Sequence, residues 1–180
     1  MKYKEFRTAA HRHLLSCEKM CEKLNELQNA NDKRDLIADI YYLSGYIVET
    51  LLSFAIFSVA GRRIQNNPIE MHPDYNNGFR THNFQAKIHF AITHGCNFDG
   101  MPFIGTRHSN ENLGKLFRAW QVDMRYQYHF KFQNSPELID DKMICAYIVE
   151  LSKLEHLINQ KFILFSYLIV LIILIRFSHH

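Results

Sequence analysis

The sequence predicts an all-α fold: an antiparallel bundle of four to five helices, with an extended arm before the last helix and an apolar C-terminal tail. Apolar residues recur at three- and four-residue intervals through most of the chain. Only 7 glycines and 4 prolines interrupt the 180 residues, and the hydrophobic content of 47% is ample for one core. We therefore expect one helical domain over residues 1–160, followed by a tail over residues 161–180.

Residues 32–61 form the longest apolar stretch of this domain, and we expect them to be its central helix. Asn31 and Asp32 offer N-cap oxygens, and Gly61 offers a left-handed stop. At about 1.5 Å per residue the helix is roughly 43 Å long, so it needs several partner helices. It is too charged to span a membrane. Its polar residues form one narrow stripe, which predicts burial of the rest. The stripe consists of Asp35, Asp39, Glu49 and Ser53, with Tyr42 and Tyr46 between them.

Three shorter helices are expected around it. Residues 6–27 have one apolar and one charged face, and a short polar link joins them to the central helix, which favours antiparallel packing. Residues 82–94 form a third helix that ends before Gly95. After Ser109 or Asn110 comes a short helix with core-facing residues at helical spacing. Those residues are Leu113, Leu116, Phe117 and Trp120. The stretches 62–80 and 95–109 are expected to be loops.

Alternation of apolar and polar residues over 122–133 has a period of two, which indicates an extended segment. No second segment of this kind offers a partner strand, so we expect an arm laid across the bundle. The last helix is predicted to begin at Ser135–Pro136, where serine is a good cap and proline fits the first turn.

The apolar run 162–175 cannot have a wet face, because Ser166 and Tyr167 are its only polar residues. Fourteen residues span about 21 Å as a helix, short of the roughly 20 residues that a bilayer requires. Two interpretations remain: a short membrane anchor with Lys161 and Arg176 at its ends, or a buried or non-native extension.

Composition excludes several functions. The 21 basic and 18 acidic residues give a net charge of +3, too small to hold nucleic acid by bulk charge. The N-terminus lacks the apolar region of a secretory signal, which predicts a cytoplasmic protein with free thiols. His13, Cys17 and Cys21 share a helix face that could ligate a metal, but core packing explains it better. No HExxH or repeated ligand spacing occurs among the 11 histidines, so we expect no metal and no cofactor.

Two stretches combine aromatic, small and charged residues in a recognisable order: YYLSGYIVETLL at residues 41–52, and Trp120 followed by Asp123-Met124-Arg125-Tyr126. Both resemble the HEPN superfamily, the higher eukaryote and prokaryote nucleotide-binding domains. YYLSGYIVETLL, residues 41–52, is similar to the small-residue step followed by an acid in that family's second helix. Trp120, followed by Asp123-Met124-Arg125-Tyr126, resembles the tryptophan and RY element before its final helix. The resemblance covers roughly residues 6–160.

The resemblance implies a bundle of four or five helices, often dimeric, that in many members is a metal-independent ribonuclease of toxin–antitoxin or phage-defence systems. Active members carry an arginine, a polar residue and a histidine, with four to six residues between the arginine and the histidine. Here Arg125 and His129 match in type, but only three residues separate them, and Tyr126 stands where a polar residue is usual. In a helix the two would lie about 6 Å apart, but in a strand roughly 13 Å.

RNA cleavage without metal uses the 2′-hydroxyl as nucleophile, a histidine as acid or base, and a cation against the phosphate. Arg125 and His129 are therefore the expected catalytic residues. Arg125 could instead pair with a buried acid such as Asp39 or Glu49, and His129 could be the polar side of the arm. Other candidates stand in loops or at helix ends, where solvation explains them better. They are Arg80, His82, Arg107 and His108.

Two hypotheses follow. The first is an endoribonuclease whose composite site forms between two Arg125 side chains in a homodimer, with an antitoxin as partner. The second is a non-catalytic HEPN module that binds nucleotide, RNA or a partner protein, held at a membrane by its tail. The short gap between Arg125 and His129 favours the second hypothesis, and the arginine keeps the first open.

Overall fold

The computed structural model describes residues 3–63, 75–105, 110–123 and 139–177, and within them the side chains of 5–59, 76–105, 110–123 and 139–163. These ranges contain helices and no β-strand. In chain order the elements are α1 (Tyr3–Leu24), α2 (Ala30–Arg63), the π-helix η2 (Tyr75–Phe79), α3 (Phe84–Thr93), α4 (Glu111–Ala119) and α5 (Asp141–Phe177). The predicted all-α character is confirmed.

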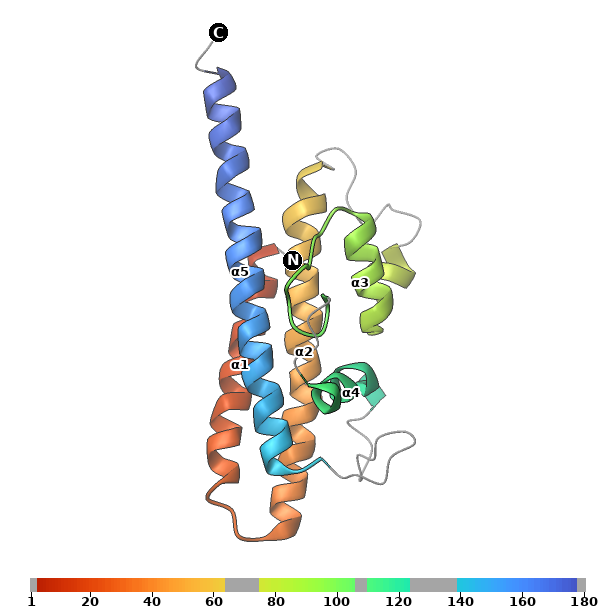
Figure 1. The fold of residues 1–180 in the computed structure, drawn as a ribbon, viewed down its shortest axis with the longest axis vertical. Helices are drawn as coiled ribbons and strands as arrows, with labels where there is room; N and C mark the ends of the chain where they lie inside the picture. Colours follow the sequence, from red (N-terminus) through yellow and green to blue (C-terminus); the bar gives the residue numbers. More distant parts are fainter. Residues whose placement is uncertain (1–2, 64–74, 106–109, 124–138, 178–180) are drawn as a thin grey trace.

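The three long helices α1, α2 and α5 pack against one another, and α3 and α4 cover the other side of α2 (Figure 1). α1 runs antiparallel to α2, as expected, but α2 and α5 run in the same direction (Figure 1). Lys33 stands near the start of α2 and Asp141 is the first residue of α5, and Lys33 Nζ lies 3.9 Å from Asp141 Oδ2. The expectation of a purely antiparallel bundle was therefore wrong, because the segment between α2 and α5 returns the chain to the end where α2 began.

The central helix is α2, and it begins and ends at other residues than the sequence predicts. Asn29, rather than Asn31 or Asp32, supplies the cap, because its Oδ1 accepts the Asn31 N–H at 2.8 Å. At the other end the helix continues through Gly61 to Arg63, so Gly61 does not stop it. Its apolar face is the core: Leu51 and Ala55 are fully buried and Phe54 is almost so.

Both short helices have an asparagine cap, of which the sequence predicted only Asn110, and α3 begins at Phe84 rather than at His82. The Asn83 side chain accepts the Ala86 N–H at 3.0 Å at the start of α3, and Gly95 follows its end with a φ of 91°. Asn110 Oδ1 accepts the Asn112 N–H at 2.9 Å and caps α4. The expected loop 62–80 is in part helical, since α2 extends into it and η2 closes it.

α5 begins at Asp141, later than the predicted start at Ser135–Pro136. Asp140 Oδ1 accepts the Met143 N–H at 2.7 Å, so Asp140 is the cap, and Ile139 precedes the helix. Of the predicted arm 122–133, only Val122 and Asp123 are described, and they begin a 3₁₀ turn rather than a strand. The remainder of the arm lies outside the described residues.

α5 continues without interruption from the bundle into the apolar tail, and its C-terminal part extends past the other described helices (Figure 1). Phe162, the first apolar residue of the tail, is 3% exposed and packs edge-on against Phe98, with ring centroids 5.9 Å apart. The core therefore includes the beginning of that stretch. Among the described side chains, residues 30–59 of α2 contain a stretch that is apolar and long enough to cross a bilayer, and 67% of its most apolar 18 residues are buried in the protein.

Candidate functional site

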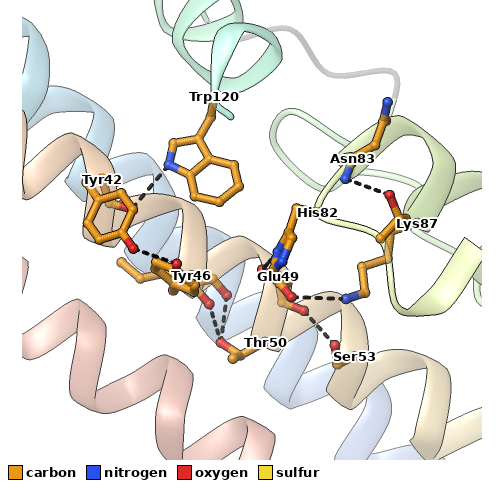
Figure 2. Close-up of polar contacts among 11 residues, drawn as sticks. Tyr42, Tyr46, Glu49, Thr50, Ser53, His82, Asn83, Lys87 and Trp120 are labelled. Carbon is orange, nitrogen blue, oxygen red and sulfur yellow. Dashed lines mark hydrogen bonds and ion pairs between the residues drawn. The ribbon is translucent and has the colours of Figure 1, made fainter. Parts of the chain in front are cut away.

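Trp120, at the C-terminal end of α4, lies directly on α2 at Gly45 (Figure 2). A Cβ atom added at Gly45 would overlap the indole ring, so only glycine allows this approach. The indole N–H donates to the Tyr42 carbonyl at 3.1 Å. The two stretches that resemble HEPN domains thus meet each other in space.

Phe84 connects this contact to α3. Its ring stacks on Trp120 with centroids 4.9 Å apart and an interplanar angle of 4°, and it also contacts Phe117 of α4. The aromatic stack fixes the start of α3 against the end of α4. Since Phe84 directly follows His82 and Asn83, the stack also places His82 over α2 (Figure 2).

Glu49 of α2 contacts two nitrogen-bearing side chains, one on each carboxylate oxygen (Figure 2). His82 Nδ1 lies 2.8 Å from Oε2, and Lys87 Nζ lies 3.7 Å from Oε1. The side chain of Lys87 is 3% exposed, that of Glu49 18% and that of His82 48%. The cluster therefore runs from the protein interior to its surface, with Glu49 in the middle.

Lys87 is almost completely buried for a cation. Burial lowers the pKa of Lys87, and the Glu49 carboxylate opposes this change. The ammonium also lies 5.0 Å from the centroid of the Phe79 ring, a cation–π distance. The Lys87 N–H donates to the Asn83 carbonyl at 3.0 Å, which fixes Lys87 relative to the N-cap that follows His82.

Beside the cluster lies a half-open cavity of about 340 Å³ between the start of α3 and the end of α4. Phe84, Phe117 and Trp120 form its apolar wall. Its polar lining comes from His82, Gln85, Arg118, Gln121 and Asp123. The cavity thus combines one imidazole, one guanidinium, one carboxylate and amides, a set that can bind a polar ligand and exchange protons with it.

The predicted catalytic residues Arg125 and His129 lie outside the described residues, which stop at Asp123 on the cavity wall. The structure therefore neither brings them together nor separates them. Of the suggested partners for Arg125, Asp39 is exposed, and Glu49 already contacts Lys87 and His82.

Among the other candidates, Arg80 is exposed and Arg107 and His108 lie outside the described residues. His82 was expected to be solvated rather than catalytic; its side chain is 48% exposed, and it also bonds to Glu49 and lines the cavity. Sequence analysis did not identify Lys87. Its spacing in the sequence could have indicated it. Lys87 stands at i+3 from Phe84, on the helix face that also carries Ile88 and Ala91, and a cation on such a face needs a buried partner.

A second cavity, of about 510 Å³, lies over α3 and η2 and includes His89, Thr93 and His94. No group of three or more His, Cys, Asp or Glu in the described part of the chain could hold a metal ion. Cys17 is fully buried in the core, whereas Cys21 is half-buried, and both are free thiols.

Comparisons of the chain with protein-family models, with proteins of curated function and with solved structures found no match.

Proposed function

We propose that this protein is a HEPN-type, metal-independent endoribonuclease of a toxin–antitoxin or phage-defence system. The observation that carries the proposal is the cavity beside Trp120, which holds a carboxylate-bonded histidine and ends at Asp123, two residues before Arg125. The contact of Trp120 with Gly45 supports it as well, because both belong to the stretches that carry the resemblance.

In this proposal Arg125 contacts the phosphate through its planar guanidinium, and an imidazole takes the proton of the RNA 2′-hydroxyl. The family pattern suggests His129 for this step, and the described wall of the cavity offers His82 as the alternative imidazole. The apolar wall and the amides of the cavity hold the nucleotide next to the bond that is cleaved.

The test is cleavage of RNA in the presence of EDTA, with products that end in a 2′,3′-cyclic phosphate. Arg125→Ala should abolish cleavage without lowering Tm, and Arg125→Lys should not restore it if planar contact with the phosphate is required. Arg34→Ala, at an exposed arginine near the start of α2, is the matched control and should cleave normally.

His129→Ala separates the roles of the two residues. Lost cleavage at unchanged stability supports an Arg125 and His129 pair, whereas an unchanged rate removes His129 from the site. If Arg125→Ala destabilises the fold by several kcal/mol, as expected on leaving a buried acid unpaired, Arg125 is structural and the proposal fails.

A second function, a non-catalytic HEPN module that binds RNA, nucleotide or a partner protein, is favoured by one observation. Only three residues separate Arg125 from His129, and Tyr126 replaces the usual polar residue. Such a module should bind a fluorescent oligoribonucleotide in anisotropy measurements while leaving it intact.

The nuclease proposal includes a homodimer and an antitoxin. Light scattering at micromolar concentration should then give twice the chain mass of 21.4 kDa. A nucleotidyltransferase encoded next to this protein would be the expected antitoxin, and co-expression with it should suppress cleavage.

A further inference from the structure

The cluster of Lys87, Glu49 and His82 contains an ion pair and, in addition, a histidine. Lys87 and Glu49 already compensate each other, and His82 adds a third group on the solvent side, with 48% of its side chain exposed. Exposed pairs of this kind contribute little to folding, because solvent and salt screen the attraction. Stability therefore does not explain why a histidine stands there.

The contact with Glu49 orients the imidazole. A carboxylate accepts hydrogen bonds, so the Nδ1 atom of His82, 2.8 Å from Oε2, carries the proton and donates it. The neutral ring then has its lone pair on Nε2, the nitrogen that Glu49 does not contact. An imidazole whose Nδ1–H is held by a carboxylate is the arrangement of a general base.

The buried Lys87 ammonium holds the Glu49 carboxylate in the position where it accepts the His82 Nδ1–H. Lys87 Nζ faces the other oxygen of Glu49 from inside the protein, 3.7 Å from Oε1, and its positive charge attracts the carboxylate to this position. His82 therefore meets an acceptor with a fixed position, because Glu49 lies on the central helix and Lys87 on a helix capped by Asn83.

We infer that His82 is the general base of the cavity, with Glu49 as its positioning residue; this inference rests on the proposed ribonuclease function. His82 Nε2 takes the proton of the RNA 2′-hydroxyl, whose oxygen attacks the phosphorus. The bond from phosphorus to O5′ breaks, and O5′ takes a proton from water. The products are a 2′,3′-cyclic phosphate and a 5′-hydroxyl, and His82 then returns its proton to water.

The other charged groups around the imidazole fit this role. Arg118 and Asp123 line the same cavity from the end of α4 and the residues after it, and both are exposed. Arg118 can contact the phosphate, whose negative charge grows in the transition state. Within the described residues, Glu49 is the acid that bonds to His82 directly.

The experiment measures steady-state cleavage of an oligoribonucleotide by the full chain and by His82→Ala. The expected result is a fall in kcat of about 100-fold or more at an unchanged Tm, since a general base contributes about that factor. Added imidazole should restore part of the rate in His82→Ala, because it can enter the space that the side chain leaves in the cavity.

His89→Ala is the matched control. His89 is an exposed histidine of α3 that lies at the other cavity, so its variant should keep the wild-type rate and gain nothing from imidazole. A purely structural role of His82 would lower Tm and would not respond to imidazole.

The role of Glu49 needs a variant that folds. Glu49→Gln alone would leave the Lys87 ammonium buried without its partner, so it is combined with Lys87→Met, and the reference is Lys87→Met alone. The amide oxygen still accepts the Nδ1–H but carries no charge. We expect kcat to fall by about tenfold or more relative to the reference, with KM within about twofold.

The outcomes are distinguishable. An active wild type together with an equally active His82→Ala overturns the inference and leaves the proposed function standing. A His82→Ala protein that is inactive and does not respond to imidazole also overturns it. A wild type that cleaves no RNA overturns both.

Discussion

Gly45 has no side chain at the point where the Trp120 indole crosses α2. The indole can therefore pack directly on the backbone of α2, which holds the end of α4 against that helix. The ring lies against the backbone, bonds to the Tyr42 carbonyl and stacks on Phe84. One missing methyl group therefore sets the distance between α2 and the wall of the cavity.

The first prediction compares two glycines. Gly45→Ala should destabilise the protein by about 1–3 kcal/mol, because its Cβ overlaps buried indole atoms. Gly114→Ala, in the middle of α4, meets only the end of the flexible Arg118 side chain and should be neutral or stabilising by about 0.5–1 kcal/mol. Urea unfolding of both variants checks this, and equal effects would contradict the contact.

The second prediction concerns buried thiols. Burial raises the pKa of Cys17 and of Cys96 from 9.0 to about 12, and it raises the pKa of Tyr41 as well. The unfolded chain releases these protons at lower pH than the folded one, so stability is complete below pH 9 and falls as the pH rises towards 12. Unfolding free energies measured at increasing alkaline pH should decline, and the decline should be smaller in Cys96→Ala. An unfolding free energy that stays constant as the pH rises would contradict this prediction.

At the scale of the element, α2 buries several hydroxyl groups without partners on other helices. Each serine hydroxyl donates to a backbone carbonyl of the same helix: Ser44 to that of Tyr41 at 2.6 Å, Ser53 to that of Glu49 at 2.8 Å and Ser58 to that of Phe54 at 2.7 Å. Because these bonds stay within the helix, small polar residues can face the core. This explains how α2 can carry serines on the face that packs against other elements.

The third prediction compares two leucines. Leu51→Ala on α2 should cost about 2–5 kcal/mol, because the side chain is fully buried and its removal leaves a cavity. Leu15→Ala on α1, where the residue is 43% exposed, is the matched control and should cost much less. Thermal unfolding followed by circular dichroism at 222 nm, near the usual helix minimum, checks both variants. Similar losses would mean that the core face of α2 is misassigned.

At the scale of the whole molecule, α5 belongs to two environments. Its first half packs against α1 and α2, and its last part continues as a helix beyond them (Figure 1). The sequence of that part is apolar on every face from Ile163 to Ile175, with Arg176 after it. A second helix would cover only one stripe of such a surface, whereas lipid would cover all of it.

The fourth prediction is therefore membrane binding by this part of α5. The full chain should float with phosphatidylcholine vesicles, and a chain lacking residues 164–180 should remain folded and stay at the bottom of the gradient. Deletion from Phe162 onward should also lower Tm, because that ring packs on Phe98 in the core. A full chain that does not float, or an unfolded shorter one, would contradict the membrane assignment.

Periodicity alone was enough to predict the helices and their core faces. The burial of Leu113, Leu116, Phe117 and Trp120 follows from their helical spacing, and the caps Asn83 and Asn110 follow from local chemistry. These are short-range effects, in which a residue and its neighbours within one helical turn decide the outcome.

Helix ends depended on tertiary packing. Gly61 was expected to stop α2, yet the helix continues to Arg63, since a glycine permits a left-handed stop without requiring one. Likewise, Ser135–Pro136 is a good start by composition, but Asp140 caps α5.

The sequence by itself determined that the chain is helical, which faces are apolar, and that Glu49 belongs to a polar stripe on the central helix. Only the tertiary structure decided what Glu49 meets, because Lys87 and His82 lie more than thirty residues away along the chain. Their approach depends on Phe84 stacking on Trp120 and on Trp120 lying over Gly45. Local spacing contains no information about such contacts, since they arise from how separate helices pack.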